Sequence, residues 1–516
     1  MKNRTNRVLV TLVIAVAVFL LIEAVLIWHV RFTDYDEAVF LDIARNIRRL
    51  GLPLRSVGEN GVLFFNHTPL YLYVVTASVT VFGENQFLLR LVTTLFGAGA
   101  IILSYGIVRR SQSVEAAFVT AVLVALNAFF ALYAYFLTME VPMTFLIVLA
   151  LYWLACADET PDYRQGYRYL ALAGFASALA ILLKELAVIF VAAAALYVFA
   201  TGRTWRERIA RPFWLLLPLL FALGLWVMWG FNLDAVGFKA GIAGWFRSAL
   251  GTGGIVDARS RITLVTWLSS LSRDVFGAGL VVLFLASFPA YFFFFRRRLP
   301  RIILLVLLYI ALALAASILV RLKEPRHLMA VIPMMSIAIG LLVDWQHIGA
   351  WVRKKRIRWV VTAVLVLLFA WQISPLKLPP PTQWQNRESW WEPLFSNRLY
   401  RSQYYYSLVR ETGDYLAQTT PSDAIIAVIH EGPVLGYYAD RHHYFLYTMS
   451  LSRTIEVLDS VNYLVIDNFI FPMQTEEEKE QVRTYIDLHF HVVKTLEDVH
   501  RQIHVYQRNA AEVNQP

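Results

Sequence analysis

Residues 87–110 read FLLRLVTTLFGAGAIILSYGIVRR, an apolar run that ends on two arginines. Before the Arg109 and Arg110 pair, the run holds one charged residue, Arg90. A membrane-spanning helix needs about 20 largely apolar residues, and basic residues gather at its cytoplasmic end. The stretch therefore predicts a transmembrane helix whose C-terminal end faces the cytoplasm.

The same pattern recurs on both sides of this run and predicts about eleven spans, the first of them an uncleaved N-terminal helix. Residues 69–83 are apolar but short, and we expect them to lie in the outer membrane interface, because counting them as a span would invert the later basic loops. This layout puts the N-terminus in the cytoplasm and the C-terminus outside. The expected spans are 8–28, 87–108, 114–136, 140–157, 168–183, 187–200, 212–231, 275–295, 302–320, 327–343 and 358–374.

Composition agrees with a membrane protein, since 58% of the 516 residues are hydrophobic and 16% are charged. Average soluble domains are about 45–50% apolar and about 25% charged. The net charge of +10 comes from short basic clusters between apolar runs, which favours contact with membrane lipid over nucleic acid. The single cysteine, Cys156, excludes an intrachain disulfide.

Three regions are expected. Residues 1–374 form a transmembrane domain that includes a first outside loop, 29–86. A proline-rich linker, PLKLPPP, spans 375–381, and residues 382–516 form a small α/β domain outside the membrane.

Within that domain, alternating and continuous apolar patterns predict its elements. These elements are strands at 424–429 and 462–467, a helix at 475–490 and an edge strand at 504–507.

A second long outside loop, 232–274, is expected in the transmembrane domain. It contains GTGG and is interpreted as a mobile lid.

Candidate chemistry begins with Asp36 and Glu37, directly after the first span. Apolar residues at helical spacing predict an amphipathic helix over 37–50, and two carboxylates at its start are favoured by the helix dipole. Capping of the helix is the alternative role. His67 precedes a proline that opens the apolar stretch, and it either holds a phosphate or is an interfacial histidine without a task.

Further charges lie at the outer ends of spans. Glu140 is a functional candidate because acids at membrane depth are costly; the alternative is a cap or loop residue. Lys184 and Glu185 interrupt a long apolar stretch. Basic residues are usually enriched on the cytoplasmic side of a membrane, so Lys or Arg outside suggests a local anion such as a lipid phosphate. The alternative is that these long side chains snorkel to the membrane interface. A second such cluster contains Arg321, Lys323, Glu324, Arg326 and His327.

These acids, bases and histidine share the outer face. A base for a hydroxyl and cations for a departing phosphate are what glycosyl transfer from a lipid phosphate requires. A transporter or flippase of lipid-linked sugars is the alternative, and it would place its ionisable groups near the midplane, often in inverted repeats. A sensing or structural membrane protein would leave the Asp36 and Glu37 loop without a role.

Six segments, in order along the chain, resemble the GT-C superfamily, and within it the protein O-mannosyltransferase, aminoarabinose transferase and RgtA/B/C/D-like group. The resemblance implies a polytopic helical fold with an outer α/β domain. The segments are YDEAVFLDIARNI (35–47), NHTPLYLYVVTASVTVFGENQFLLRLVTTLFG (66–97), LTMEVPMTFLIVLAL (137–151), LAILLKELAVIFV (179–191), KEPRHLMAVIPMMSI (323–337) and IIAVIHEGPVLGYYADR (425–441).

The resemblance implies an inverting transferase that takes a sugar, such as the hexose mannose, from a polyprenyl-phosphate donor to the hydroxyl of a protein, lipid or glycan. Asp36 matches the family's catalytic base, Glu37 its partner and Glu140 the second-loop acid. The donor-binding residues implied are His67, Lys184, Arg326 and His327.

The sequence also departs from its relatives. Thr68 replaces a proline, and His327 stands where tyrosine is common. Val39 stands where aminoarabinose transferases have arginine, which argues against that substrate. The MIR domains of eukaryotic mannosyltransferases are missing, which suggests a prokaryotic plasma membrane. Because only some relatives bind a divalent metal at the acidic pair, a metal is possible and none is expected to be essential.

Overall fold

A computed structural model describes most of the chain. The described residues are 2–29, 35–250, 264–292, 299–319, 324–343, 406–429, 432–446, 449–467, 475–497 and 502–509. The predicted span 358–374 and linker 375–381 lie outside them, as do Arg321 and Lys323. The chain divides into two compact units: the first contains 1–28, 65–71 and 87–397, and the second contains 29–64, 72–86 and 398–516.

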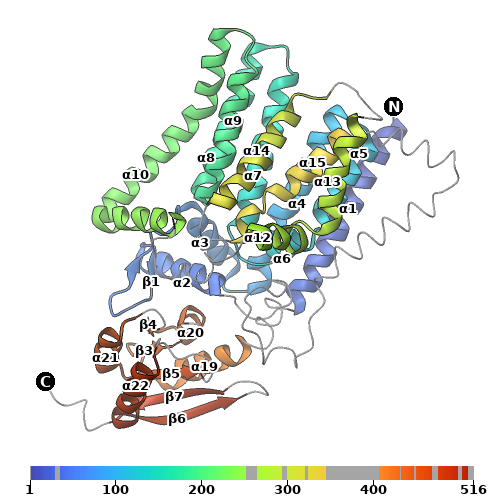
Figure 1. Ribbon diagram of the computed structural model, residues 1–516. Helices are drawn as coiled ribbons and strands as arrows, with labels where there is room; N and C mark the ends of the chain where they lie inside the picture. The colour runs from blue at the N-terminus through green and yellow to red at the C-terminus, as the bar shows by residue number, and fades with distance from the viewer. Residues whose placement is uncertain are drawn as a thin grey trace. The chain divides into compact units, whose positions relative to one another are not determined.

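The first unit is helical (Figure 1). Its elements are α1 (Lys2–His29), α4 (Gln86–Ser111), α5 (Val114–Ala125), α6 (Ala128–Ala134), α7 (Glu140–Glu159), α8 (Tyr163–Leu183), η1 (Glu185–Ala187), α9 (Val188–Ala200), α10 (Trp205–Leu250), α12 (Leu264–Ser270), η3 (Leu271–Val275), α13 (Ala278–Ala290), α14 (Ile302–Leu319), η5 (Pro325–Leu328) and α15 (Val331–Leu342).

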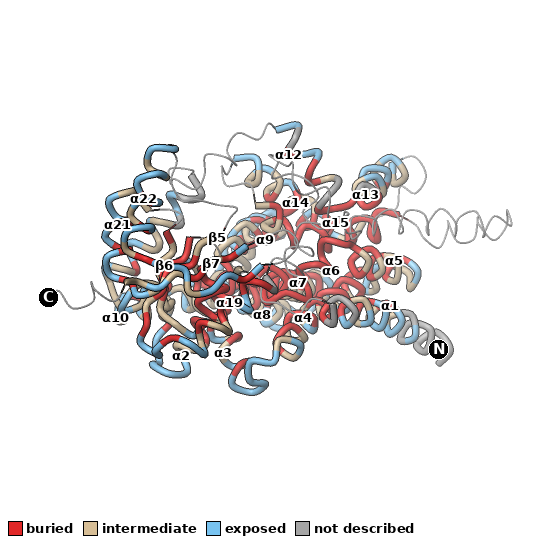
Figure 2. The backbone as a smooth tube through the Cα atoms, turned by 90° about the horizontal axis from the view of Figure 1, so that it is seen from below, coloured by how far each residue is buried: buried red, intermediate tan, exposed pale blue. Residues whose placement is uncertain are grey.

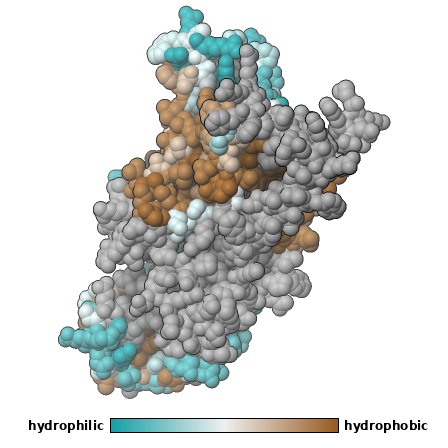
Figure 3. Space-filling view, turned by 45° about the vertical axis from the view of Figure 1, so that its right-hand side comes forward, coloured by the Kyte–Doolittle hydropathy of each residue, from teal (hydrophilic) through white to brown (hydrophobic). Residues whose placement is uncertain are grey.

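Apolar side chains cover both the interior and the surface of this unit. α7 and α15 are mostly buried (Figure 2), whereas α10 exposes large apolar side chains such as Leu220, Phe221 and Met228 at 65%, 69% and 62%. A hydrophobic belt crosses the visible helices, with hydrophilic residues above it (Figure 3). Such a surface is stable when lipid replaces water around it, so the chain is a multi-pass membrane protein.

Within the described residues, six helices are long and apolar enough to cross a membrane, or seven if α5 and α6 form one bent span. Four shorter apolar helices lie at Leu12–Ala24, Leu70–Phe82, Glu185–Ala200 and Gly279–Ala290. The short stretch expected at 69–83 is thus helical, as α3 (Leu70–Phe82). The total of eleven spans stays a prediction.

The run expected as one helix over 114–136 is broken into α5 and α6, which meet at 63°. Asn127 lies at the break. Its side-chain oxygen caps α6 by accepting from the Phe130 N–H at 2.9 Å, and its amide donates to the Phe276 carbonyl at 2.9 Å. Asparagine at a helix N-cap starts a new helix direction, which the apolar pattern alone does not reveal.

The prediction of a loop over 232–274 was wrong for most of its length. α10 continues to Leu250 with a bend at Asp234, whose carboxylate accepts from the Val236 N–H at 3.0 Å and restarts the helix. Beyond the bend, Phe238 is buried and packs edge-on against Phe65. α12 and η3 follow from Leu264, and the GTGG segment expected as a lid lies outside the described residues.

The second unit combines residues 29–64 and 72–86, most of the stretch expected as the first outside loop, with the C-terminal segment 398–516. Its elements are α2 (Tyr35–Leu50), β1 (Leu54–Arg55), β2 (Val62–Leu63), most of α3, α19 (Tyr406–Thr419), β3 (Ile425–Val428), α20 (Gly432–Ala439), β4 (His442–Phe445), α21 (Leu451–Ser460), β5 (Tyr463–Asp467), α22 (Glu476–His489), β6 (Phe490–Glu497) and β7 (Gln502–Arg508). The expected small α/β fold is therefore confirmed.

The larger sheet of this unit has the strand order β4-β3-β5-β7-β6. β3 is parallel to β4 and β5, whereas β7 is antiparallel to β5 and β6. The strand expected at an edge, 504–507, is therefore an inner strand, because β6 pairs outside it. α21 and α22 pack on the sheet through a shared apolar core that includes Val457, Leu458, Leu464, Val482 and Ile486.

Close packing of helices gives a first test of the fold. A Cβ on Gly174 of α8 would clash with the backbone oxygen of Leu215 in α10, whereas a Cβ on Gly224 of α10 would meet nothing within 4 Å. We expect Gly174→Ala to lower thermal stability in detergent, by an overpacking cost of about 1–3 kcal/mol. Gly224→Ala is the matched control and should melt at or above the wild-type temperature. Equal melting of the two variants would contradict the α8–α10 contact.

Candidate active site

Glu140 is the first residue of α7 and is 2% exposed. The N-terminal end of a helix carries unpaired N–H groups and a partial positive charge, which favour a carboxylate there. Pro142 lies in the same first turn, where a missing N–H removes no helix hydrogen bond. The local sequence thus starts α7 with a buried acid.

Lys184, at the C-terminal end of α8, provides the positive charge that balances Glu140. It follows α8 as the C-cap, with extended backbone angles, and its own N–H donates to the Ala180 carbonyl. Its Nζ lies 2.5 Å from Glu140 Oε1, and the two side chains are 4% and 3% exposed. A cation at a helix C-terminus is favoured by the dipole, so both charges of this buried pair are supported by their helices.

Arg326 adds a second cation. It lies in η5, just before α15, with Nε 3.4 Å from Glu140 Oε1 and 3.6 Å from Glu324 Oε2. Its side chain is 21% exposed, which makes it more accessible than Lys184. His327 is the next residue, half-buried, and its N–H donates to the Glu324 carbonyl at 3.1 Å.

His67 belongs to the same unit and is held by Glu185. Its Nδ1 lies 3.1 Å from Glu185 Oε1, and the histidine side chain is 30% exposed. The hydroxyl of the next residue, Thr68, donates to the Ile181 carbonyl at 2.8 Å. Lys184 and Glu185 are consecutive residues after α8. This short segment therefore makes both contacts, Lys184 with Glu140 and Glu185 with His67.

Asp36 and Glu37 occupy the first turn of α2 in the second unit, and the helix expected over 37–50 is confirmed. Asp36 is half-buried, and Glu37 is 1% exposed. Among the predicted residues, the structure thus brings together Glu140, Lys184 and Arg326, and it describes the Asp36 and Glu37 pair in the other unit.

Glu185 and Glu324 are partners of the predicted residues that the sequence analysis did not assign. The Lys184 and Glu185 interruption marked the place, but the Glu185 contact joins His67 across 118 positions, which no local pattern encodes.

Within the described ranges, no group of three or more His, Cys, Asp or Glu side chains is placed to hold a metal ion. Glu140 is matched by two cations, which disfavours a metal there. The expectation that a divalent metal is possible at Asp36 and Glu37 and is not essential stays a prediction.

The buried pair gives a stability prediction. Lys184→Met leaves the Glu140 carboxylate buried with the more distant Arg326 as its remaining cation, and losing one partner of a buried ion pair typically costs about 3–5 kcal/mol. We expect a clear drop in the thermal unfolding temperature in detergent.

Two further variants complete this test. Adding Glu140→Gln should restore much of the loss, since the second change removes the buried charge. Arg110→Gln breaks an exposed pair with Glu159 and should change little. A Lys184→Met protein as stable as Arg110→Gln would contradict the assignment.

Comparisons with known proteins bear on this arrangement. Residues 66–229 match the family described as dolichyl-phosphate-mannose-protein mannosyltransferase. An uncharacterized protein of Aquifex aeolicus is 28% identical over 193 residues, and that match covers 37% of this chain and 38% of that protein.

Solved structures match over more of the chain. The crystal structure of ArnT from Cupriavidus metallidurans in the apo state matches at 15% identity with a TM-score of 0.68, covering 98% of this chain and 99% of that one. The same protein bound to undecaprenyl phosphate matches with a TM-score of 0.66, again at 15% identity, covering 98% and 99% of the two chains.

A second neighbour is the archaeal oligosaccharyltransferase AglB from Archaeoglobus fulgidus, in complex with an inhibitory peptide and a dolichol-phosphate. It matches at 14% identity with a TM-score of 0.58, covering 89% of this chain and 69% of that one. Another structure of this archaeal enzyme holds Zn and sulfate. These likenesses confirm the fold that the six sequence segments implied: the chain shares the fold of ArnT and AglB.

Proposed function

We propose that this chain is a membrane glycosyltransferase that moves a sugar, such as the hexose mannose, from a polyprenyl-phosphate donor to an acceptor hydroxyl at the outer face of the plasma membrane. The observation that carries the proposal is the Glu140, Lys184 and Arg326 cluster, which places a partly exposed arginine beside a buried ion pair at the ends of membrane helices. ArnT and AglB, which share the fold, have been solved with undecaprenyl phosphate and dolichol-phosphate.

The cations divide into two roles in this proposal. Lys184 neutralises Glu140 and is too enclosed to meet a ligand first. Arg326 and His67 are more exposed, at 21% and 30%, and are the groups that contact the donor phosphate, with His327 beside them. Glu140 and Glu185 hold these cations in place. A fixed cation aimed at developing phosphate charge stabilises the transition state more than the ground state.

Asp36 is the general base. The acceptor oxygen attacks the anomeric carbon as Asp36 takes its proton, and the bond from that carbon to the phosphate oxygen breaks. The polyprenyl phosphate leaves with the electron pair, and the configuration at the anomeric carbon inverts. Glu37, buried beside Asp36, supports the site. The donor's lipid tail stays in the bilayer throughout, which limits the reaction to the membrane surface.

A transporter or flippase of lipid-linked sugars is the rival function. Its ionisable groups would line a path near the bilayer midplane. Glu140, Lys184 and Arg326 instead lie at helix ends: Glu140 begins α7, Lys184 follows α8, and Arg326 precedes α15. Incubating the purified protein with radiolabelled polyprenyl-phosphate sugars separates the two, since the transferase consumes the donor and a flippase does not.

The role of Asp36 is tested by Asp36→Asn, which removes the base and keeps the size of the side chain. We expect donor consumption in membranes to fall to background while expression and membrane insertion are unchanged. Asp423→Asn, an exposed site before β3, is the matched control and should keep full activity. Wild-type turnover by the Asp36→Asn protein would refute the assignment.

The role of Arg326 is tested by Arg326→Gln. Loss of one fixed charge on the leaving phosphate is expected to lower kcat by on the order of 10²–10³. Arg326→Lys should recover part of the rate because it restores charge without the planar guanidinium. A normal kcat in Arg326→Gln, with the wild type active in the same assay, would show that the phosphate binds elsewhere.

A further inference from the structure

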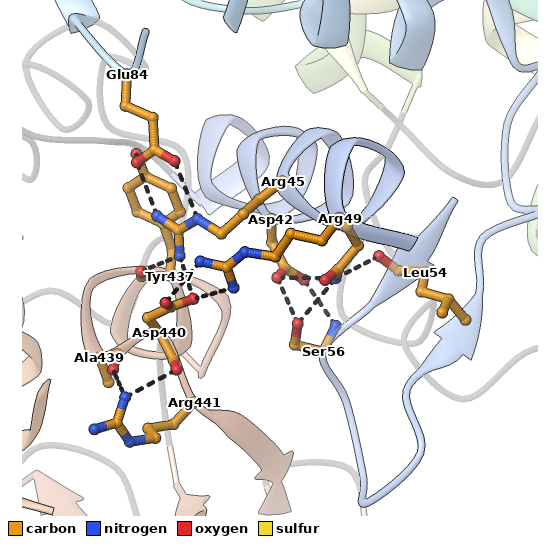
Figure 4. A network of polar contacts seen from close by, with 11 residues as sticks. Asp42, Arg45, Arg49, Leu54, Ser56, Glu84, Tyr437, Ala439, Asp440 and Arg441 are labelled. Carbon is orange, nitrogen blue, oxygen red and sulfur yellow. Dashed lines mark hydrogen bonds and ion pairs between the residues drawn. The ribbon is translucent and has the colours of Figure 1, made fainter. Parts of the chain in front are cut away.

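α2, the helix that begins with Asp36 and Glu37, is fastened to the C-terminal part of the second unit by a group of charged side chains. We call this group the arginine clamp, and Figure 4 shows it from close by. Its members come from α2, from the turn between α3 and α4, and from the end of α20. They are Arg45, Arg49, Glu84, Tyr437 and Asp440.

Arg45 is the centre of the clamp. Its Nε and Nη2 donate to the two carboxylate oxygens of Glu84 at 3.1 and 2.8 Å, and its Nη1 donates to Asp440 Oδ1 at 2.9 Å. The same Nη1 donates to the Tyr437 carbonyl at 3.1 Å, and the guanidinium lies 4.6 Å from the Tyr437 ring centre. Arg45 thereby uses the planar, multidentate geometry that lysine lacks.

Asp440 receives a second arginine. Nη1 and Nη2 of Arg49 donate to its two carboxylate oxygens at 3.1 and 3.0 Å. Burial raises the pKa of Asp440, but the hydrogen bond from Arg49 and the charge of Arg45 outweigh it and hold the pKa below its usual value. Arg45 and Arg49 are one helical turn apart, so both point to the same carboxylate from one face of α2.

The backbone conformation of Asp440 would favour glycine, which indicates that the aspartate side chain has a role there. Its φ is 49°, a left-handed conformation directly after the last residue of α20, where glycine is the preferred residue. A negative charge at a helix C-terminus is also disfavoured by the dipole. Asp440 is thus an unfavourable local choice on both counts, and its two bonds to α2 offset that cost.

A second contact fastens the same helix. The segment after β1 pairs with the edge strand β4: the His443 N–H donates to the Ser56 carbonyl at 3.1 Å, and the Gly58 N–H donates to the His443 carbonyl at 2.9 Å. Asp42 of α2 then accepts from the Ser56 N–H at 2.8 Å and from its hydroxyl at 2.6 Å. Two separate contacts therefore fix both the position and the rotation of α2.

We propose that Asp440 is a positioning residue: through Arg45 and Arg49 it sets the direction of α2 and so places the Asp36 carboxylate. The C-terminal domain then serves as the platform of the catalytic helix. This inference rests on the proposed function, because it assigns the geometry of its general base.

The expected loss of rate follows from the distance along α2 between Asp36 and the clamp. Nine residues separate Asp36 from Arg45, about 14 Å along a helix. A tilt of about 10° would move the carboxylate by about 2 Å, and a misplacement of about 1 Å can lower a rate by about 10².

The test compares Asp440→Gly, Asp440→Asn and the control Glu456→Gln, which removes an exposed ion pair on α21 of the same unit. Hydrogen exchange of residues 35–50 and of β5 is measured in each full-length protein, together with melting temperature and with kcat and KM for a polyprenyl-phosphate mannose. Glycine suits the left-handed backbone, so Asp440→Gly removes the bonds from Arg45 and Arg49 to the Asp440 carboxylate without harming the fold.

We expect Asp440→Gly to melt like the wild type, to exchange faster in 35–50 but not in β5, and to lose about 10- to 100-fold in kcat at an unchanged KM. Asp440→Asn should lose less, and Glu456→Gln nothing. Unchanged exchange in 35–50 would overturn the clamp, and faster exchange with a normal kcat would overturn the positioning role. A wild-type protein that consumes no donor would overturn the proposed function, while the exchange data still decide the clamp.

Discussion

The ion pair between Glu140 and Lys184 is the interaction on which the membrane unit depends. Two charges that are almost fully enclosed lose their hydration, and their attraction offsets this only when the geometry is close and further groups support each charge. Here the start of α7 supports the acid and the end of α8 supports the base. The pair therefore requires the start of α7 to lie beside the end of α8, and this in turn sets where Arg326, bound to the same carboxylate, presents its charge.

The second unit holds a short amphipathic helix, α2, through contacts with other parts of the same unit. α2 is too short to be stable by itself, because short helices depend on tertiary contacts. Its arginines reach Asp440 and its Asp42 reaches Ser56, so the helix is bound at two places to one sheet domain. The first unit thus fixes the Arg326 guanidinium, and the second fixes the helix that begins with Asp36 and Glu37.

Sequence reasoning recovered what local patterns encode. The apolar run 87–108 became α4, the acids at 36 and 37 did begin a helix, and Glu140 did begin a span. It failed where a single polar residue redirects the chain: Asn127 breaks 114–136, and Asp234 bends α10 without ending it. Pairings across long separations, such as His67 with Glu185 or Arg45 with Asp440, depend on packing that no window of sequence contains. The strand β6 was missed because its buried and exposed residues do not alternate cleanly.

The most direct measurement is an experimental structure of the full chain in a lipid nanodisc with undecaprenyl phosphate. We expect the phosphate within hydrogen-bonding distance of the Arg326 guanidinium, Lys184 still bound to Glu140, and the Asp36 carboxylate on the same side of the bilayer as Arg326. A phosphate seated away from Arg326, or Asp36 on the opposite side of the bilayer from it, would contradict the account.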